Sequence, residues 1–123
     1  MPDMRGLTII LTEAAPERLR GALMMALTNL ALGGRARLFL QFEAVDLLAP
    51  PLASPRDEAH AAAGLPTLAQ LMDDALTQGV DIILCQTGLH LTGRRAQDMD
   101  PRCQFAGIAS LMAEIADDRL LAL

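Results

Sequence analysis

The sequence predicts an α/β fold built on a largely parallel sheet. Short apolar runs of strand length alternate along the chain with amphipathic helical segments, and no linker or internal repeat interrupts the alternation. Elements in this order form a parallel sheet with helices on both faces, joined by right-handed crossovers. At 123 residues the chain is expected to be one domain over residues 1–123.

The first half of the chain contains two expected strands around one long helix. Residues 7–11 form a continuous apolar run, and helix-opening residues follow it. Leucines at helical spacing then continue to Gly33-Gly34, which is expected to end the helix. Residues 37–42 predict a second strand. The proline-rich segment 43–66 predicts a mobile excursion with a short alanine-rich helix.

The second half continues the alternation. Residues 67–70 (TLAQ) fit a capping box, and Gly79 is expected to end the helix that they open. A third strand at 80–84 then leads directly into Cys85. The remaining expected elements are a short helical segment at 86–93, a loop at 94–101, a strand at 102–105, a helix opened by Gly107 and a final apolar run at 119–123.

Composition and charge exclude several classes of partner. The net charge is −5 and aromatic residues make up only 2% of the chain, so neither phosphate neutralisation nor base stacking is favoured. No apolar stretch is long enough to span a membrane, and the amino-terminal apolar run is too short for a secretory signal. We therefore expect a cytoplasmic protein with no nucleic-acid or membrane partner.

Cys85 is the candidate for chemistry because of its place in this alternation. In open α/β sheets, ligands and reactive groups gather beyond the carboxyl ends of the strands. A cysteine between a strand end and a helix start also meets unpaired N–H groups, which favour the thiolate. The other interpretation is a small apolar residue that completes a buried strand. Position alone leaves both interpretations open.

Four neighbours in the sequence could support Cys85, and each has a simpler interpretation. His90 could act as a base or ion-pair partner, although five residues along a helix is a poor same-face spacing. Arg94 and Arg95 could make the site electropositive, or they could be solvated loop charges. Cys103 could resolve an oxidised Cys85 if their strand ends are neighbours, or it could be a buried strand residue.

No cofactor or metal site is indicated by the motifs. The sequence has no glycine-rich phosphate loop between a strand and a helix, which makes nucleotide binding a weak alternative. The two cysteines match neither a CxxC pair nor a zinc-binding pattern, and His60 has no ligand partner at metal spacing. We expect no cofactor, no metal and two free thiols.

Four stretches of the chain, taken together, form a recognisable pattern: "LTIILTEAAPERLRGALMMALTNLALGG", "LPTLAQLMDDALTQG", "GVDIILCQTGLHLTG" and "FAGIASLMAEIADDRLLAL". In this order they resemble the DsrE/DsrF-like family of small sulfur-relay proteins. The resemblance covers nearly the whole chain in the order of its elements. The chain departs from better-known members after Phe42, where Asp46 and the proline-rich excursion occur.

This resemblance implies a three-layer α/β/α sandwich with a mainly parallel five-stranded sheet, assembled as a homotrimer, a hexamer or a related hetero-oligomer. It also implies that the thiol at the position of Cys85 accepts sulfane sulfur as a persulfide and passes it to a partner such as a TusA-like carrier. The leading hypothesis is therefore a sulfur transferase or carrier. The alternative is a non-catalytic structural or interaction subunit in which Cys85 is buried and the apolar surplus forms a subunit interface.

Overall fold

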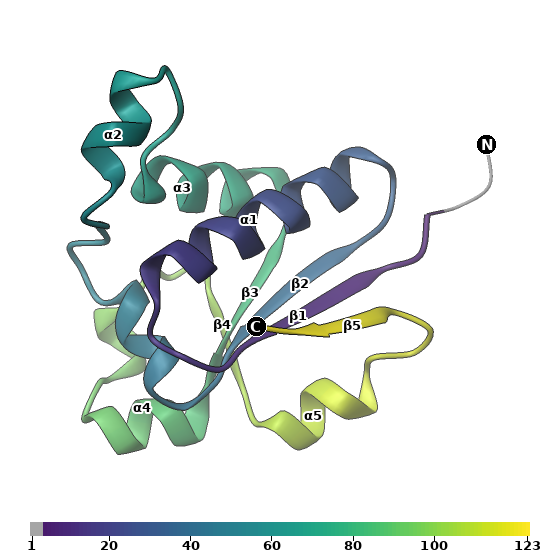
Figure 1. Cartoon of the computed structure of the whole chain (residues 1–123). Helices are drawn as coiled ribbons and strands as arrows, with labels where there is room; N and C mark the ends of the chain where they lie inside the picture. The colour runs from purple at the N-terminus through teal and green to yellow at the C-terminus, as the bar shows by residue number, and fades with distance from the viewer. Residues whose placement is uncertain (1–3) are drawn as a thin grey trace.

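The computed structural model describes residues 4–123, which form a five-stranded, all-parallel sheet with helices on both sides (Figure 1). The strand order is β4-β3-β2-β1-β5. The strands are β1 (Leu7–Leu11), β2 (Ala36–Leu40), β3 (Asp81–Cys85), β4 (Gln104–Ala106) and β5 (Arg119–Ala122). The helices are α1 (Pro16–Ala31), α2 (Asp57–Ala62), α3 (Leu68–Gln78), α4 (Gln86–Thr92) and α5 (Ile108–Ala113), with 3-10 segments η1 (Phe42–Leu48) and η2 (Ala96–Asp98).

The helices divide between the two sides of the sheet. Helices α1 and α3 pack against each other over one face, while α5 lies on the opposite side and α4 sits at the carboxyl end of β3 (Figure 1). This arrangement confirms the predicted α/β sandwich with its parallel five-stranded sheet. No helix within residues 4–123 has both the length and the apolar character needed to cross a membrane.

The core lies between the central strands and the α1–α3 layer. All five residues of β2 are buried, as are the last four of β3. Leu19 and Leu23 of α1 and Leu68 of α3 are fully buried as well. Each such side chain contributes about 1.5 to 3 kcal/mol relative to an exposed one. This packing fixes the carboxyl ends of β2 and β3 side by side.

The predicted helix signals around α3 are confirmed. Thr67 and Gln70 form a reciprocal capping box, in which the Gln70 N–H donates to Thr67 Oγ1 over 3.2 Å and the Thr67 N–H donates to Gln70 Oε1 over 2.8 Å. Gly79 ends the helix in the left-handed conformation, with φ of 106°. The next residue, Val80, donates its N–H to Ala75 and so completes the helix end; β3 begins at Asp81 rather than at Val80.

The expected second strand was too long at its carboxyl end. Strand β2 stops at Leu40, and Phe42 begins η1 with a left-handed φ of 51°. The chain turns here because η1 packs closely against α4, the helix that follows Cys85. The sequence pattern does not reveal this turn, because Leu40 before it and Phe42 after it are both apolar residues typical of strands.

The fourth strand starts two residues later than predicted. Strand β4 covers Gln104–Ala106, whereas Arg102 lies in the preceding turn. The Arg102 guanidinium bonds to Asp100 over 2.8 Å and to Asp73 of α3 over 2.9 Å. These ion pairs hold Arg102 outside the ladder. The expected loop before it, 94–101, includes the short segment η2.

The proline-rich excursion is attached to α1 by charged side chains. Arg20, almost fully buried, donates to Asp57 over 2.7 Å and to Glu17 over 2.9 Å. Asp57 also accepts the Leu68 N–H over 2.8 Å, and the Ser54 hydroxyl donates to Glu17. Segment 43–66 is expected from the sequence to be a mobile excursion with a short alanine-rich helix. It contains most of η1 and all of α2, which is the expected alanine-rich helix, and the contacts above tie it to the α1–α3 layer.

Candidate functional site

Cys85 is the last residue of β3 and the N-cap of α4. Its strand is an inner one, flanked by β2 and β4, and Cys85 lies level with Ala106 at the end of β4. The residue is only 3% exposed. The structure thus places Cys85 at the carboxyl edge of a parallel sheet, as the sequence predicts, with its sulfur below the surface.

Within residues 4–123, the Cys85 sulfur accepts one hydrogen bond. The backbone N–H of Gly88 donates to Cys85 Sγ over 3.3 Å. This N–H is one of the groups at a helix start that have no partner within the helix. A hydrogen bond to sulfur is stronger when the acceptor is a thiolate, which is the form that acts as a nucleophile.

Gly88 itself is fixed by the neighbouring segment η1. A Cβ added to Gly88 would lie 2.3 Å from the carbonyl oxygen of Phe42 and 3.0 Å from Val45 Cγ1. Only glycine allows this approach of two backbones. Phe42 has a left-handed φ of 51° and is 43% exposed. Sequence reasoning did not identify Phe42 or Gly88; the glycine within a short helical segment was the available signal.

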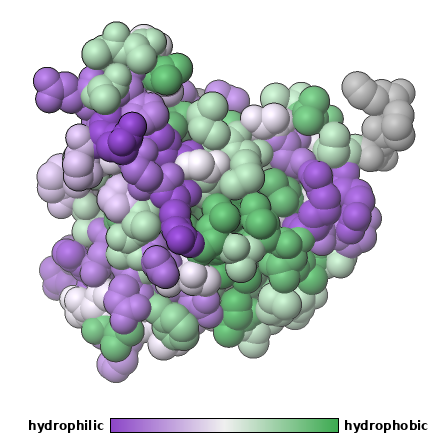
Figure 2. Space-filling view, in the orientation of Figure 1, coloured by the Kyte–Doolittle hydropathy of each residue, from purple (hydrophilic) through white to green (hydrophobic). Residues whose placement is uncertain are grey.

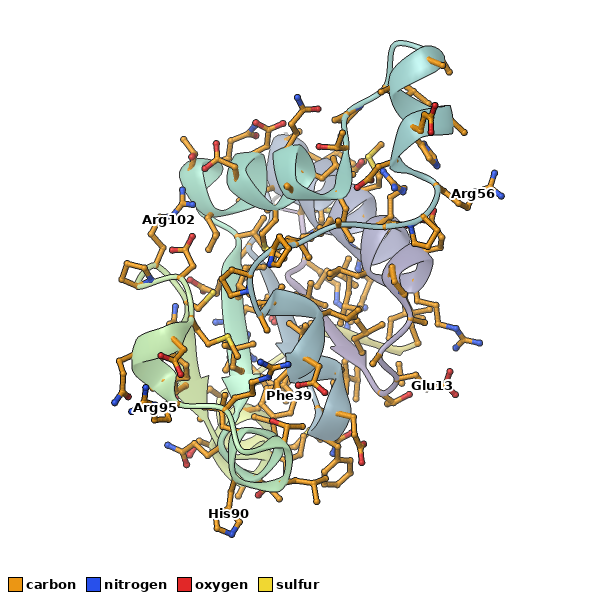
Figure 3. All side chains as sticks on the ribbon, turned by 90° about the vertical axis from the view of Figure 1, so that its left-hand side faces the viewer. Glu13, Phe39, Arg56, His90, Arg95 and Arg102 are labelled. Atoms are coloured by element: carbon orange, nitrogen blue, oxygen red, sulfur yellow. The ribbon has the colours of Figure 1, made fainter. Side chains whose placement is uncertain are left out.

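His90 lies apart from Cys85. It occupies the last turn of α4, whereas Cys85 caps the first turn. Its side chain is exposed and points away from the protein at the bottom of Figure 3. The structure shows no hydrogen bond between these two side chains among the described contacts. The geometry therefore gives His90 no direct contact through which to act as a base on the thiol.

Arg94 and Arg95 are each bonded to a carboxylate. Arg94 Nε pairs with Asp46 Oδ1 over 2.9 Å, which joins the end of α4 to η1. Arg95 pairs with Asp98 over 3.2 Å, and Figure 3 shows it at the outer edge of the molecule. These pairs are exposed and contribute about 0 to 1 kcal/mol each to stability. Their main effect here is that each positive charge is matched by a nearby negative one.

Cys103 faces a different part of the molecule. Cys103 is buried as expected, but it lies in the turn before β4 rather than in the strand. It precedes Ala106, the residue level with Cys85, by three positions, or roughly 10 Å along the strand direction. Disulfide formation needs Cα atoms within about 7 Å. Cys103 instead lines a groove beneath α3, and burial raises the pKa of its thiol to about 11. The two free cysteines are both buried, and the structure does not bring them together.

The comparisons with known proteins identify the family. Residues 5–123 match the DsrE/DsrF-like family. The chain belongs to that family. Its fold is similar to that of a protein of unknown function, MTH1491, from Methanobacterium thermoautotrophicum, with a TM-score of 0.71 over 98% of this chain and 100% of that one. The two sequences are 13% identical, so this likeness concerns the fold. None of the curated proteins matches the sequence significantly.

The DsrE/DsrF-like domain shows no metal-binding cluster within residues 4–123: no three His, Cys, Asp or Glu side chains lie close enough together to hold an ion. His60 lies on α2, with its Nε2 3.6 Å from Glu17 Oε1 in the network that attaches the excursion. What the arrangement offers chemically is a thiol with a backbone donor, at the edge of the sheet where the loops meet.

Proposed function

We propose that this DsrE/DsrF-like protein is a sulfur transferase or sulfur carrier that holds sulfane sulfur as a persulfide on Cys85. Family membership favours a role in sulfur relay. The observation that supports the residue assignment is the position of Cys85 at the carboxyl end of an inner strand, with the Gly88 N–H donating to its sulfur. Neither cofactor nor metal is needed for this exchange.

The proposed reaction consists of two thiol exchanges. The Cys85 thiolate attacks the outer sulfur of a donor persulfide; a new S–S bond forms, the donor S–S bond breaks, and the donor leaves as a thiolate. An acceptor thiolate then attacks the outer sulfur of the Cys85 persulfide. A new S–S bond forms on the acceptor, the S–S bond to Cys85 breaks, and Cys85 is released as a thiolate. The Gly88 N–H stabilises the negative charge on Cys85 Sγ before the first exchange and after the second.

Burial of the thiol limits which molecules can reach it. Cys85 is 3% exposed, so few molecules can contact its Sγ. An added sulfur lies about 2 Å from Sγ, the length of an S–S bond. The proposal therefore requires that the outer sulfur of the persulfide extends toward the surface, where an acceptor thiolate can contact it.

Mass spectrometry of the intact protein tests this proposal directly. The reduced protein is incubated with inorganic polysulfide, freed of excess reagent and weighed, with the Cys85→Ser and Cys103→Ser variants treated in parallel. We expect a gain of one sulfur atom that a reductant reverses, absent from Cys85→Ser and present in Cys103→Ser. Sulfur that loads onto Cys103, or none at all, contradicts the assignment.

A structural or interaction subunit is the second candidate function. The burial of Cys85 favours it, because a buried cysteine packs as a small apolar side chain. The rate at which iodoacetamide modifies native Cys85 separates the two functions. If the protein is a carrier, iodoacetamide should modify Cys85 at urea concentrations well below the midpoint of unfolding. If the thiol is structural, Cys85 should react only when the protein unfolds.

Self-association and a partner carrier complete the proposal. Apolar side chains gather on the face formed by α1 and the β1–β5 edge, where Figure 2 shows a continuous hydrophobic surface. We propose that such surfaces assemble the protein as a homo-oligomer, a trimer or hexamer, and that a TusA-like carrier is the sulfur partner. Both described cysteines are free thiols, which suits the cytoplasmic location expected from the sequence.

A further inference from the structure

A groove of about 340 Å³ lies between α3, the excursion and the turn before β4. Its volume is within the range of small-ligand sites. Cys85 is not among its lining residues, so the groove is separate from the proposed sulfur site. We infer that this groove binds a small aliphatic cation, whose alkyl chain lies on the apolar floor and whose positive charge lies at the acidic rim.

The floor of the groove suits an alkyl chain. Its apolar lining includes Leu48, Leu52, Ala69, Met72, Leu76 and Met99. Methionine side chains are flexible and polarisable, and they adapt to apolar ligands of different shape. Cys103 completes the floor, and because its pKa is raised to about 11 the thiol is neutral at physiological pH. The floor therefore carries no charge that would oppose an alkyl group.

The rim of the groove determines the sign of the ligand charge. Three carboxylates, Asp73, Asp98 and Asp100, line it together with a single guanidinium, that of Arg102. Arg102 bonds to both Asp73 and Asp100, so two negative charges share one positive charge. Figure 3 shows Arg102 beside α3 at this edge of the molecule.

Asp98 faces Arg95, which lies outside the groove. The rim as a whole keeps an excess of negative charge, which attracts a cation and opposes an anion of the same shape. The preference comes from charge, because the floor contacts an alkyl chain in the same way whatever its head group.

The test uses three probes that share one alkyl chain: hexyltrimethylammonium, hexanol and hexanesulfonate. Each is titrated into the full-length protein, and binding is followed by NMR of ¹³C-labelled methionine methyl groups. Met72 and Met99 report on the groove, whereas Met24 and Met112 are exposed elsewhere. We expect Met72 and Met99 to shift, with the cation bound about tenfold more tightly than the anion, a difference of about 1.4 kcal/mol.

Three variants assign the binding to the groove and to its charge. Ala69→Leu fills the groove from the exposed side of α3 and is expected to abolish the shifts. Asp73→Asn should reduce the preference for the cation. Asp74→Asn removes an adjacent exposed carboxylate that does not line the groove, and it should leave the preference unchanged.

Equal affinity for cation and anion, binding that survives in Ala69→Leu, or shifts confined to Met24 and Met112 would each overturn the inference. So would the absence of any shift at Met72 and Met99. None of these results depends on sulfur loading at Cys85, so the two proposals succeed or fail separately.

Discussion

The backbone N–H of Gly88 donates to the sulfur of Cys85 over 3.3 Å, while the same glycine leaves no room for a Cβ beside the carbonyl oxygen of Phe42. One residue thus connects the thiol to the segment that follows the neighbouring strand. Any change at Phe42 or in η1 that moves Gly88 also moves the donor away from the sulfur. The reactivity of Cys85 is therefore sensitive to contacts outside its own strand and helix.

Gly88→Ala should weaken both the fold and the thiol. The new Cβ would meet the Phe42 carbonyl oxygen at 2.3 Å, so α4 and η1 must separate. We expect a loss of about 1 to 3 kcal/mol in the free energy of unfolding, as for other overpacked sites. Below the unfolding transition, native Cys85 should react more slowly with iodoacetamide at pH 7, because its hydrogen-bond donor is displaced. Urea unfolding and alkylation kinetics measure the two effects.

Gly21→Ala is the matched control for that substitution. Gly21 lies in α1, and a Cβ there would contact nothing within 4 Å. Alanine should stabilise this helix by about 0.5 to 1 kcal/mol and leave the Cys85 alkylation rate unchanged. If Gly21→Ala and Gly88→Ala lowered the free energy of unfolding and the Cys85 alkylation rate by similar amounts, the contact with Phe42 would not be the cause of the effect at Gly88.

Cys103 should make the protein less stable at alkaline pH. Burial, with a smaller contribution from Asp100, raises the pKa of its thiol to about 11 from 9.0, so the unfolded chain releases the proton at lower pH than the folded one. Stability is then fully present below about pH 9 and falls by about 1.4 kcal/mol per pH unit up to pH 11. The chain contains no lysine and no tyrosine, so few other groups titrate in this window.

The measurement is urea unfolding of the reduced protein between pH 8 and 11, compared with Cys103→Ala. The variant should show a flatter dependence on pH, whatever its stability at pH 8. The same slope in both proteins would mean that the Cys103 thiol ionises in the folded state as readily as in the unfolded chain.

The fold was largely predictable from sequence because its signals are local. The capping box at Thr67, the left-handed Gly79 and the uninterrupted apolar strands each act within a few residues. The position of Cys85 followed from the same local pattern, since a strand end and a helix start are adjacent in the chain. At Phe42 and Arg102, where an expected strand extended too far, the residue contacts a distant part of the chain.

Contacts between distant residues account for what sequence could not show. Phe42 lies outside β2, where its backbone packs against Gly88, and Arg102 lies outside β4, where it pairs with Asp73. Arg37 is buried in β2, within 4 Å of the Asp118 carboxylate, although it reads as a strand boundary in the sequence. The groove that contains Cys103 likewise joins three separate segments, so no window of sequence could indicate it.

Asp57→Asn should loosen the excursion from α1. Hydrogen bonds from the Leu68 and Ser54 N–H groups and from Arg20 hold the pKa of Asp57 below its ordinary value. The contribution of Asp57 to stability is therefore present at neutral pH and is lost as pH falls below about 4. We expect the substitution to lower the free energy of unfolding by about 1 to 3 kcal/mol at pH 7 and by much less at pH 3.

Glu58→Gln is the control, because Glu58 is an exposed neighbour on α2. It should leave the free energy of unfolding unchanged at both pH values. Equal costs at pH 7 and pH 3 would contradict the ionic origin of the attachment.

The apolar face over α1 should control self-association. Met24 and Leu32 are 51% and 52% exposed, and with Leu7 and Leu121 they line a groove of about 450 Å³ at the open edge of β5. Exposed apolar surface of this kind marks interaction sites in soluble proteins.

Met24→Asp places a charge in the middle of the face and should shift the protein to smaller species in size-exclusion chromatography with light scattering. Leu91→Asp is the control, because Leu91 is similarly exposed at 58% but lies on α4, away from this face. Dissociation by Leu91→Asp and not by Met24→Asp would place the interface at the Cys85 end of the sheet instead.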